Sequence, residues 1–559
     1  MHWSSAVPIQ ETVASPRSGV QSAFTPARRV WVLLLLALTL IGTVLVHGIQ
    51  KGEFSENVDE TVHAATGLYV ASFIHDLPLR HPVQYTYRYY AQYPSLGIVM
   101  YPPAFYVIEG IAFSIFGPSV VTARLTVIFL ALLGLGFWFK LVEELEDEYT
   151  AAVSTVFLAF LPAILRYEKT VMLDIPLMAF CIATSYFWIR YLRRGSNSDL
   201  YWFAVFLCLA FLTKHHAIYL FLWCLITLAA LKKWDRILNW RAVGVGAVCF
   251  VVVAPAYVLQ IVMNSSLALN VKGTSANASM QWGYYVSRLP DLIGWPVLIL
   301  SIVGILTCRW WAKRENAILM FAWIVSCYII FTLIRHKDPD ARYILYWVPG
   351  FAYFAVAPFM RKASVQWIRV VGVTTVIAVL AFYTVRAWTY QRLYVSGYSQ
   401  LAHQLTQRGG GCVLVDMDLP GNFIFFMRAF DPPQRFVILR KALYEVRTVR
   451  EWGVSEFAHD QRDVEKVLKD DSVRYVVVEN NMPLHFSSQD ALRELLEHSG
   501  EYKMIATVPV ETNVGGWKNR TLVLYESASP VVPPNGILHI RMSNLPHDIN
   551  IPFQQLTGR

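Results

Sequence analysis

Charged residues are scarce in this sequence. They make up 16% of its 559 residues, while 55% of the residues are hydrophobic. Soluble globular domains carry about 25% charged residues. Apolar runs long enough to cross a bilayer recur along the chain, which is typical of membrane-spanning helices. The composition therefore argues against an ordinary soluble enzyme and predicts a polytopic α-helical membrane protein.

Several other signals are missing. The seven cysteines include no C-x-x-C pair, and Cys412 stands alone in the C-terminal region, so no disulfide framework is expected there. No basic arm with interleaved aromatic residues is present, so a nucleic-acid partner is not expected. His63, His215 and His216 match no metal-ligand spacing and are interpreted as interfacial histidines. No obligatory metal cofactor is predicted, and the use of a divalent metal stays open.

The few basic residues predict the topology. Arg28 and Arg29 precede the first apolar run, which lacks a small-residue cleavage site and is interpreted as an uncleaved anchor. The predicted spans, eleven in number, are 30–48, 120–142, 150–165, 175–192, 200–213, 216–231, 243–262, 290–308, 316–334, 342–359 and 368–386. The N-terminus is then cytoplasmic and the C-terminus extracytoplasmic. We expect a multi-pass protein of the plasma or inner membrane.

The long apolar runs of the sequence end at about residue 388. Short β-rich runs then alternate with helical stretches such as 461–470 and 487–499, which predicts a small α/β domain. The predicted organisation is a disordered tail (1–29), a transmembrane catalytic domain (30–387) with outer loops 50–118 and 166–174, an extracytoplasmic α/β domain (388–528) and a loosely ordered tail (529–559).

Two adjacent acids, Asp59 and Glu60, follow the first span. Asn57 can cap a helix that begins here and lies near the membrane interface, and Asn57 with Glu60 resembles a capping box. On that interpretation the acids only stabilise a helix N-terminus. The alternative is that Asp59 is a general base held at the membrane surface.

Asp174 has the same two interpretations. It precedes Ile175 and Pro176, which suits an N-cap with proline in the first turn of a span. The topology also places it on the same side of the membrane as Asp59. Two acids from different outer loops suit a site in which one takes a proton and the other orients a nucleophile.

Cations and tyrosines are predicted on the same side of the membrane as Asp59 and Asp174. Lys214 interrupts an apolar hairpin, where it either reaches the interface or binds an anion. Lys337 and Arg342 lie in a charged outer loop that is either simply solvated or binds a phosphate. Tyr101 and Tyr106 belong to a tyrosine-rich stretch that is typical of the headgroup level and that can also stack on a sugar.

These motifs, in this order, resemble the GT-C superfamily of polyprenyl-phosphate-sugar-dependent glycosyltransferases, in particular the branch with aminoarabinose transferases and protein O-mannosyltransferases. The motifs are Asp59-Glu60, Tyr101-Pro102-Pro103-Ala104-Phe105-Tyr106, Ala123-Arg124-Leu125, Leu173-Asp174-Ile175-Pro176-Leu177, Phe211-Leu212-Thr213-Lys214 and Arg342-Tyr343. The resemblance covers about residues 30–390 and implies a GT-C-like bundle.

The resemblance implies an inverting transfer from a lipid-linked sugar donor to a glycan, lipid or protein acceptor. By analogy Asp59 is the base, and Glu60 and Asp174 support it or the acceptor. Lys214 and Arg342, with Lys337, neutralise the departing phosphate. The loop with His63, Tyr101 and Tyr106 is assigned to the acceptor or the sugar.

Two other functions are compatible with some of these features. A transporter or flippase of lipid-linked glycans also carries charges within broken helices. Against it, the sequence has no inverted repeat, and its charged motifs gather at one interface. A non-catalytic GT-C-like assembly subunit is the second alternative, and the intact Asp59 and Asp174 argue against it.

Overall fold

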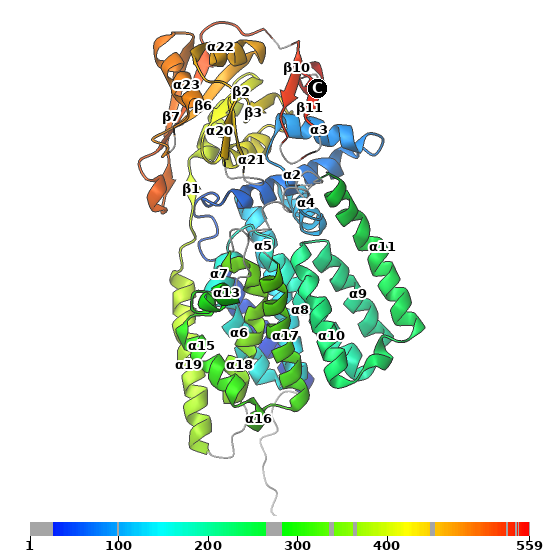
Figure 1. Ribbon diagram of the computed structural model, residues 1–559. Helices are drawn as coiled ribbons and strands as arrows, with labels where there is room; N and C mark the ends of the chain where they lie inside the picture. The colour runs from blue at the N-terminus through cyan, green and yellow to red at the C-terminus, as the bar shows by residue number, and fades with distance from the viewer. Residues whose placement is uncertain are drawn as a thin grey trace, which may run out of the picture.

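The fold has two parts, a bundle of long helices and an α/β domain stacked on one of its ends (Figure 1). Helices α2 (Val58–Asp76) and α4 (Ala104–Phe116) lie between them, and α3 (Pro82–Gln92) packs against the α/β domain. This computed structural model describes residues 26–557 apart from 98–99, 264–281, 335–339, 361–365, 448–452, 484, 533–534, 543–544 and 546. Most of the predicted N-terminal tail therefore lies outside the described residues.

The bundle contains the helices expected from the apolar runs. Within the described residues, seven helical segments are long and apolar enough to cross a membrane. They are α1 (Pro26–Val46), α5 (Val120–Leu145), α8 (Asp174–Arg194), α11 (Trp240–Met263), α17 (Arg314–Leu333), η3 with α18 (Ala341–Trp347 and Val348–Met360) and α19 (Gln366–Thr389). In the apolar window of α8, 94% of the residues are buried, against none in α11. Helix α8 thus lies at the centre of the bundle and α11 at its periphery.

Two more predicted spans are bent helix pairs. Helices α6 (Glu148–Ala159) and α7 (Pro162–Glu168) are bent by 70°. The other pair is bent by 115° and consists of α13 (Trp282–Ser287) and α14 (Leu289–Ile293), followed by α15 (Trp295–Leu306). Its bend is at Gly294, whose φ of +81° lies in the left-handed region that glycine adopts without strain. An added Cβ there would also collide with the Tyr383 hydroxyl.

The last two predicted spans correspond to shorter apolar helices. These are α9 (Asn197–Phe211) and the η1–α10 pair (His215–Ile218 and Tyr219–Leu231), which are joined at Lys214. Short connections are formed by η2 (Trp234–Arg236) and α16 (Cys308–Trp311). Each of the eleven predicted spans therefore has a helical counterpart in the described part of the chain.

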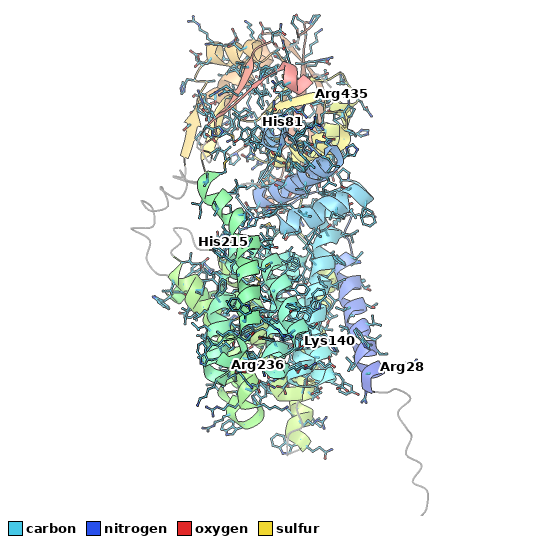
Figure 2. The ribbon with its side chains drawn as sticks, turned by 90° about the vertical axis from the view of Figure 1, so that its right-hand side faces the viewer. Arg28, His81, Lys140, His215, Arg236 and Arg435 are labelled. Carbon is cyan, nitrogen blue, oxygen red and sulfur yellow. The ribbon has the colours of Figure 1, made fainter. Side chains whose placement is uncertain are left out.

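The two ends of the bundle carry different residues. Figure 2 shows Arg28, Lys140 and Arg236 at the end far from the α/β domain, while His215 lies nearer to that domain. His215 follows Lys214, so the predicted anion-binding lysine belongs to the half of the bundle that the α/β domain covers.

The α/β domain is built on a five-stranded sheet with the order β3-β2-β6-β9-β7. Strands β2, β3 and β6 are parallel, and β9 is antiparallel to both β6 and β7. The strands are β2 (Gly411–Asp416), β3 (Phe436–Leu439), β6 (Val473–Asn480), β7 (Tyr502–Pro509) and β9 (Thr521–Ser527). The helices are α20 (Tyr398–Thr406), α21 (Pro420–Phe430), α22 (Gln461–Asp470) and α23 (Ser487–His498). Small additions are β1 (Val395–Ser396) with β8 (Glu511–Thr512), β4 (Tyr444–Arg447) with β5 (Gly453–Glu456), and η4 (Gly515–Trp517).

A buried arginine joins the two parts of the molecule. Arg124 on α5 is 1% exposed, and its guanidinium donates hydrogen bonds to backbone carbonyl groups between Ile49 and Glu53. The Glu53 carboxylate accepts hydrogen bonds of 3.1–3.2 Å from the three N–H groups at the start of α20. A carboxylate is favourable at a helix N-terminus. The loop after α1 thus connects the bundle to the α/β domain.

Helix α21 packs across α2. Gly421, in its first turn, allows this close approach, because an added Cβ would collide with Thr61 Oγ1. Near its other end, Arg428 Nη2 donates a hydrogen bond of 2.9 Å to Ser72 Oγ. The α/β domain therefore contacts α2 near both ends.

The segment 529–559 contains regular structure, which differs from the loosely ordered tail that we predicted. It forms a hairpin of β10 (Ile537–Ile540) and β11 (Ile549–Pro552), followed by α24 (Gln554–Thr557). Phe553 and Leu556 are buried, and Gln92 Nε2 on α3 donates a hydrogen bond of 2.8 Å to the Leu556 carbonyl. The strands are ordered by packing on distant residues, which a local sequence pattern does not show.

Candidate functional site

Helix α2 begins as the sequence predicts. Asn57 Oδ1 accepts a hydrogen bond of 3.0 Å from the Asp59 N–H, which is the capping contact. The predicted capping box does not form, because Glu60 Oε2 accepts a hydrogen bond of 2.7 Å from the Ser55 N–H instead of binding the Asn57 N–H. The cap uses only the backbone of Asp59, so the Asp59 carboxylate can contact other elements.

Glu60 connects two segments of the site. Its side chain is 1% exposed, and Oε1 accepts a hydrogen bond of 3.0 Å from the Val171 N–H. Val171 lies in the predicted second outer loop, which leads into Asp174. Because both Glu60 oxygens bind backbone N–H groups, Glu60 holds this loop against the start of α2. Glu60 thus joins this loop to the start of α2.

Asp59 forms an ion pair with Arg342, 283 positions further along the chain. Arg342 Nη1 donates to Asp59 Oδ2 at 2.9 Å, and Asp340 Oδ2 lies 3.0 Å from Arg342 Nε. The side chains of Asp59 and Arg342 are 33% and 16% exposed. Asp59 therefore lies at the solvent-accessible edge of a charged cluster.

Asp174 does not cap its helix. The N-cap position of α8 is Leu173, without a side-chain hydrogen bond, and Asp174 is fully buried. Asp174 Oδ1 instead accepts hydrogen bonds of 2.9 Å from Lys214 Nζ and from the Tyr346 hydroxyl. Oδ2 has no hydrogen-bond partner among the described residues. The N-cap interpretation is thus wrong, because the side chain points to Lys214 and η3 rather than to its own backbone.

Helix η3 brings the two acid–cation pairs together. It supplies Arg342 to Asp59 and Tyr346 to Asp174. The ring of Tyr343 lies near both cations, with its centre 5.5 Å from the Arg342 guanidinium and 6.0 Å from Lys214 Nζ. Tyr343 follows Arg342 in one of the motifs quoted from the sequence, whereas Tyr346 was not among the predicted residues. Both lie on the same short helix. Asp59, Asp174, Lys214 and Arg342 thus form one cluster.

His63 lies one turn further along α2 from Asp59. Its Nδ1 is 2.9 Å from the Tyr106 hydroxyl, and the centre of its ring is 5.4 Å from that of Tyr101. Burial lowers the pKa of His63 to about 4, with a smaller opposing effect from the Asp59 charge. Burial also raises the pKa of the Tyr101 hydroxyl. At neutral pH this wall of the site therefore consists of an uncharged imidazole and two protonated phenols.

Glu109 on α4 continues this wall. It is fully buried, lies against Gly67 of α2, and neither of its oxygens has a hydrogen-bond partner in the described part of the chain. Burial raises its pKa well above the ordinary value of a glutamate, which favours the protonated form. A lone acid in an apolar run is the signal that marks it in the sequence.

The remaining predictions concern Lys337 and a metal site. Lys337 lies outside the described residues, so the structure does not place it. Across the described ranges, no group of three or more His, Cys, Asp or Glu side chains is arranged to hold a metal ion. Lys214 and Arg342 are thus the predicted cations that the structure brings to the acids.

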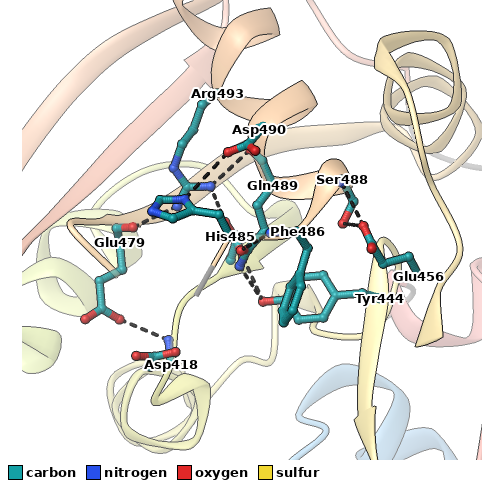
Figure 3. A network of polar contacts seen from close by, with 11 residues as sticks. Asp418, Tyr444, Glu456, Glu479, His485, Phe486, Ser488, Gln489, Asp490 and Arg493 are labelled. Atoms are coloured by element: carbon teal, nitrogen blue, oxygen red, sulfur yellow. Dashed lines mark hydrogen bonds and ion pairs between the residues drawn. The ribbon is translucent and has the colours of Figure 1, made fainter. Parts of the chain in front are cut away.

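A second polar network lies in the α/β domain (Figure 3). Asp416, at the end of β2, accepts hydrogen bonds from Tyr444, Gln489 and Arg493 at 2.7–2.8 Å. Glu479, near the end of β6, is bound by Arg520 Nη1 at 2.9 Å. Ligands often bind at the carboxyl ends of parallel strands. Here, however, both Asp416 oxygens are already paired with side chains of the domain itself.

Comparisons with known proteins identify the fold. ArnT from Cupriavidus metallidurans, bound to undecaprenyl phosphate, matches with a TM-score of 0.56 and 14% identity over 91% of this chain and 100% of that chain. The Archaeoglobus fulgidus oligosaccharyltransferase, tethered with an acceptor peptide, matches with a TM-score of 0.53 and 12% identity over 80% of this chain and 69% of that chain. Arabinofuranosyltransferase AftD from Mycobacteria matches with a TM-score of 0.51 and 14% identity over 93% of this chain and 41% of that chain.

The chain thus has the fold of the GT-C glycosyltransferases, which confirms the resemblance inferred from its motifs. Within this class, residues 101–258 match the family model described as dolichyl-phosphate-mannose-protein mannosyltransferase. A comparison with curated protein sequences gives no match. The apolar helices and these neighbours together identify a membrane protein.

Proposed function

We propose that this protein transfers a sugar from a polyprenyl-phosphate donor to an acceptor, with inversion at the anomeric carbon. Asp59 takes the proton of the acceptor hydroxyl or amine. The acceptor atom bonds to the anomeric carbon while the bond from that carbon to the phosphate oxygen breaks. The electron pair of that bond leaves with the phosphate, so the products are the glycosylated acceptor and the polyprenyl phosphate.

The observation that carries this proposal is the pairing of two acids with two cations around η3. A base must be reachable by the acceptor, and the side chain of Asp59 is 33% exposed. A departing phosphate needs positive charge where its own charge develops, and Arg342 and Lys214, which both lie within about 6 Å of the Tyr343 ring, supply that charge. Asp174 holds Lys214, and Glu60 holds the loop before Asp174 against α2.

The uncharged wall of the site is suited to bind the sugar or the acceptor. His63, Tyr101 and Tyr106 present aromatic faces and hydrogen-bonding groups without net charge. Such groups stack on and hydrogen-bond to sugars without competing for the phosphate. Lys337 is assigned to the phosphate on its sequence alone.

Two findings from relatives support the donor class. Residues 101–258 match a family that is named for a dolichyl-phosphate sugar, and ArnT binds undecaprenyl phosphate. Both lipids are polyprenyl phosphates. The acceptor class, whether glycan, lipid or protein, is left to experiment.

The proposed topology places the site on the extracytoplasmic face of the plasma or inner membrane. Arg28, Lys140 and Arg236 gather at the opposite end of the bundle, as expected for a cytoplasmic side (Figure 2). The catalytic part then spans residues 30–387, and residues 388–528 form the extracytoplasmic domain.

Native mass spectrometry of the detergent-purified protein tests the proposal. We expect the wild type to bind polyprenyl phosphates, and Asp59→Asn to accumulate the polyprenyl-phosphate sugar because it cannot complete the transfer. Reproducible absence of both lipids, even after they are added, would contradict the proposal. Binding of the donor without turnover of any acceptor by the wild type would instead favour a flippase or a non-catalytic assembly subunit.

A further inference from the structure

Arg342, which is proposed to bind the donor phosphate, is paired with Asp59, the proposed base. Arg342 Nη1 donates to Asp59 Oδ2 at 2.9 Å. We propose that the donor phosphate replaces Asp59 at Arg342, so that the donor binds first and Asp59 becomes available as a base only when the phosphate is in place. This inference rests on the proposed function and adds an obligatory order to it.

The geometry of Arg342 places Asp59 in competition with the phosphate. A guanidinium binds phosphate best through two parallel N–H donors on one edge. Arg342 has two such edges, Nη1 with Nη2 and Nε with Nη2. Asp59 is bound at Nη1, and Asp340 lies 3.0 Å from Nε. Nη1 is the donor that Asp59 uses, whereas Nε forms no hydrogen bond with Asp340 despite the short distance. A phosphate that binds the Nη1–Nη2 edge with two hydrogen bonds therefore competes with Asp59 for Nη1.

Asp340 is the more firmly held of the two. Besides its ion pair with the Arg342 side chain, its Oδ1 accepts a hydrogen bond of 2.9 Å from the Arg342 N–H, which caps η3. Its displacement would also remove the helix cap. Asp59 belongs to a different element, α2, and its departure leaves both helix caps intact because its own cap uses only its backbone N–H. The exchange therefore takes place at Asp59.

Asp174 provides an internal contrast. When Lys214 turns to the phosphate, Asp174 retains the hydrogen bond of 2.9 Å from the Tyr346 hydroxyl. Among the described residues, no second side chain donates a hydrogen bond to Asp59. Loss of Arg342 thus frees the Asp59 oxygen for the proton of the acceptor, whereas Asp174 stays in place. The same phosphate releases the base and leaves the positioning acid unchanged.

Binding of undecaprenyl phosphate to the full-length protein in detergent tests this exchange. If the carboxylate competes with the phosphate, Asp59→Asn should bind the lipid about three- to fivefold more tightly than the wild type, the size of a partly exposed ion pair. Arg342→Gln should weaken binding about tenfold or more, because it removes a charged donor. In the Arg342→Gln background, Asp59→Asn should give no further gain. Asp76→Asn, at the far end of α2, is the matched control and should bind like the wild type.

Each alternative result has a defined meaning. If folded Asp59→Asn binds undecaprenyl phosphate as tightly as the wild type or more weakly, the proposed exchange is wrong. It is also wrong if Asp340→Asn binds the lipid more tightly than the wild type and Asp59→Asn does not. Either result leaves the proposed function standing if the wild type binds the lipid and transfers sugar. Failure of the wild type to bind the lipid overturns both proposals. If Asp59→Asn does not give a monodisperse protein, Asp59→Ser removes the same charge and replaces it in every comparison.

Discussion

The acids at the end of the bundle and those in the α/β domain differ in how completely they are paired. Both oxygens of Asp416 are bound by side chains of its own domain. Asp174 Oδ2 has no partner within the described residues, and the Asp59 side chain is 33% exposed. A carboxylate whose lone pairs are occupied stabilises a fold, whereas one with remaining capacity can bind or react. Completeness of pairing thus distinguishes the structural network from the candidate site.

The largest expected effect is that of Asp59→Asn on the rate. The change removes the proposed base, so transfer should fall about 1,000-fold, within the range for the loss of a general base. The melting temperature should stay near that of the wild type, because the side chain is partly exposed and its backbone N–H still binds Asn57. Single-turnover transfer and thermal unfolding measure the two effects. A large loss of stability with a retained rate would reverse the assignment.

The second expected effect is that of Asp416→Ala on stability. The change leaves Arg493, Tyr444 and Gln489 without their shared acceptor, and breaking a buried charge pair lowers the free energy of unfolding by about 3 kcal/mol. The rate per folded molecule should stay within about twofold of the wild type, since the residue lies away from the site. Denaturant titration and transfer assays separate these quantities. Loss of transfer in a stable variant would reveal a second functional site.

The smallest expected effect comes from His63 and depends on pH. Its pKa is about 4 in the folded protein and about 6.5 in an unfolded chain. Below about pH 6.5 the unfolded chain therefore binds a proton that the folded one does not, and the stability falls by about 1.4 kcal/mol per pH unit until about pH 4.

His63→Gln serves as the reference for this effect, because it keeps a polar group near Tyr106 without titrating. Relative to this variant, the wild type should lose about 2 kcal/mol of stability between pH 6.5 and about pH 5. Thermal unfolding at several pH values measures the difference. Parallel curves for the two proteins would show that His63 titrates normally in the folded state.

The sequence predicted the elements of the bundle well. Apolar runs determine helices through local composition, so each predicted span has a counterpart, and Asn57 marks the start of α2 through a local cap. The roles of acids near helix starts were harder to predict. Asp174 looks like an N-cap by its neighbours, but a lysine 40 positions away engages its side chain. Long-range ion pairs leave no local pattern.

Contacts between the two parts of the molecule were not predictable. Gly421 and Thr61 meet where α21 crosses α2, although nothing in either segment indicates the other. Glu60 matched a capping box in sequence, but it binds the N–H groups of Ser55 and Val171 because the chain folds back over it. The family resemblance indicated the candidate site residues and included Tyr343 in a motif, whereas Tyr346 and Glu109 were recognised as neighbours of the site only in the structure.

The contact through Glu53 has a consequence for protein engineering. Its carboxylate caps α20 of the α/β domain, while its carbonyl group accepts a hydrogen bond from Arg124 of the bundle. A chimaera that receives the α/β domain of another protein with this fold would place an unmatched helix start against this carboxylate. Residues 49–53 should therefore be exchanged together with that domain, although they lie more than 340 positions before α20. The functional boundary for recombination is thus discontinuous in sequence.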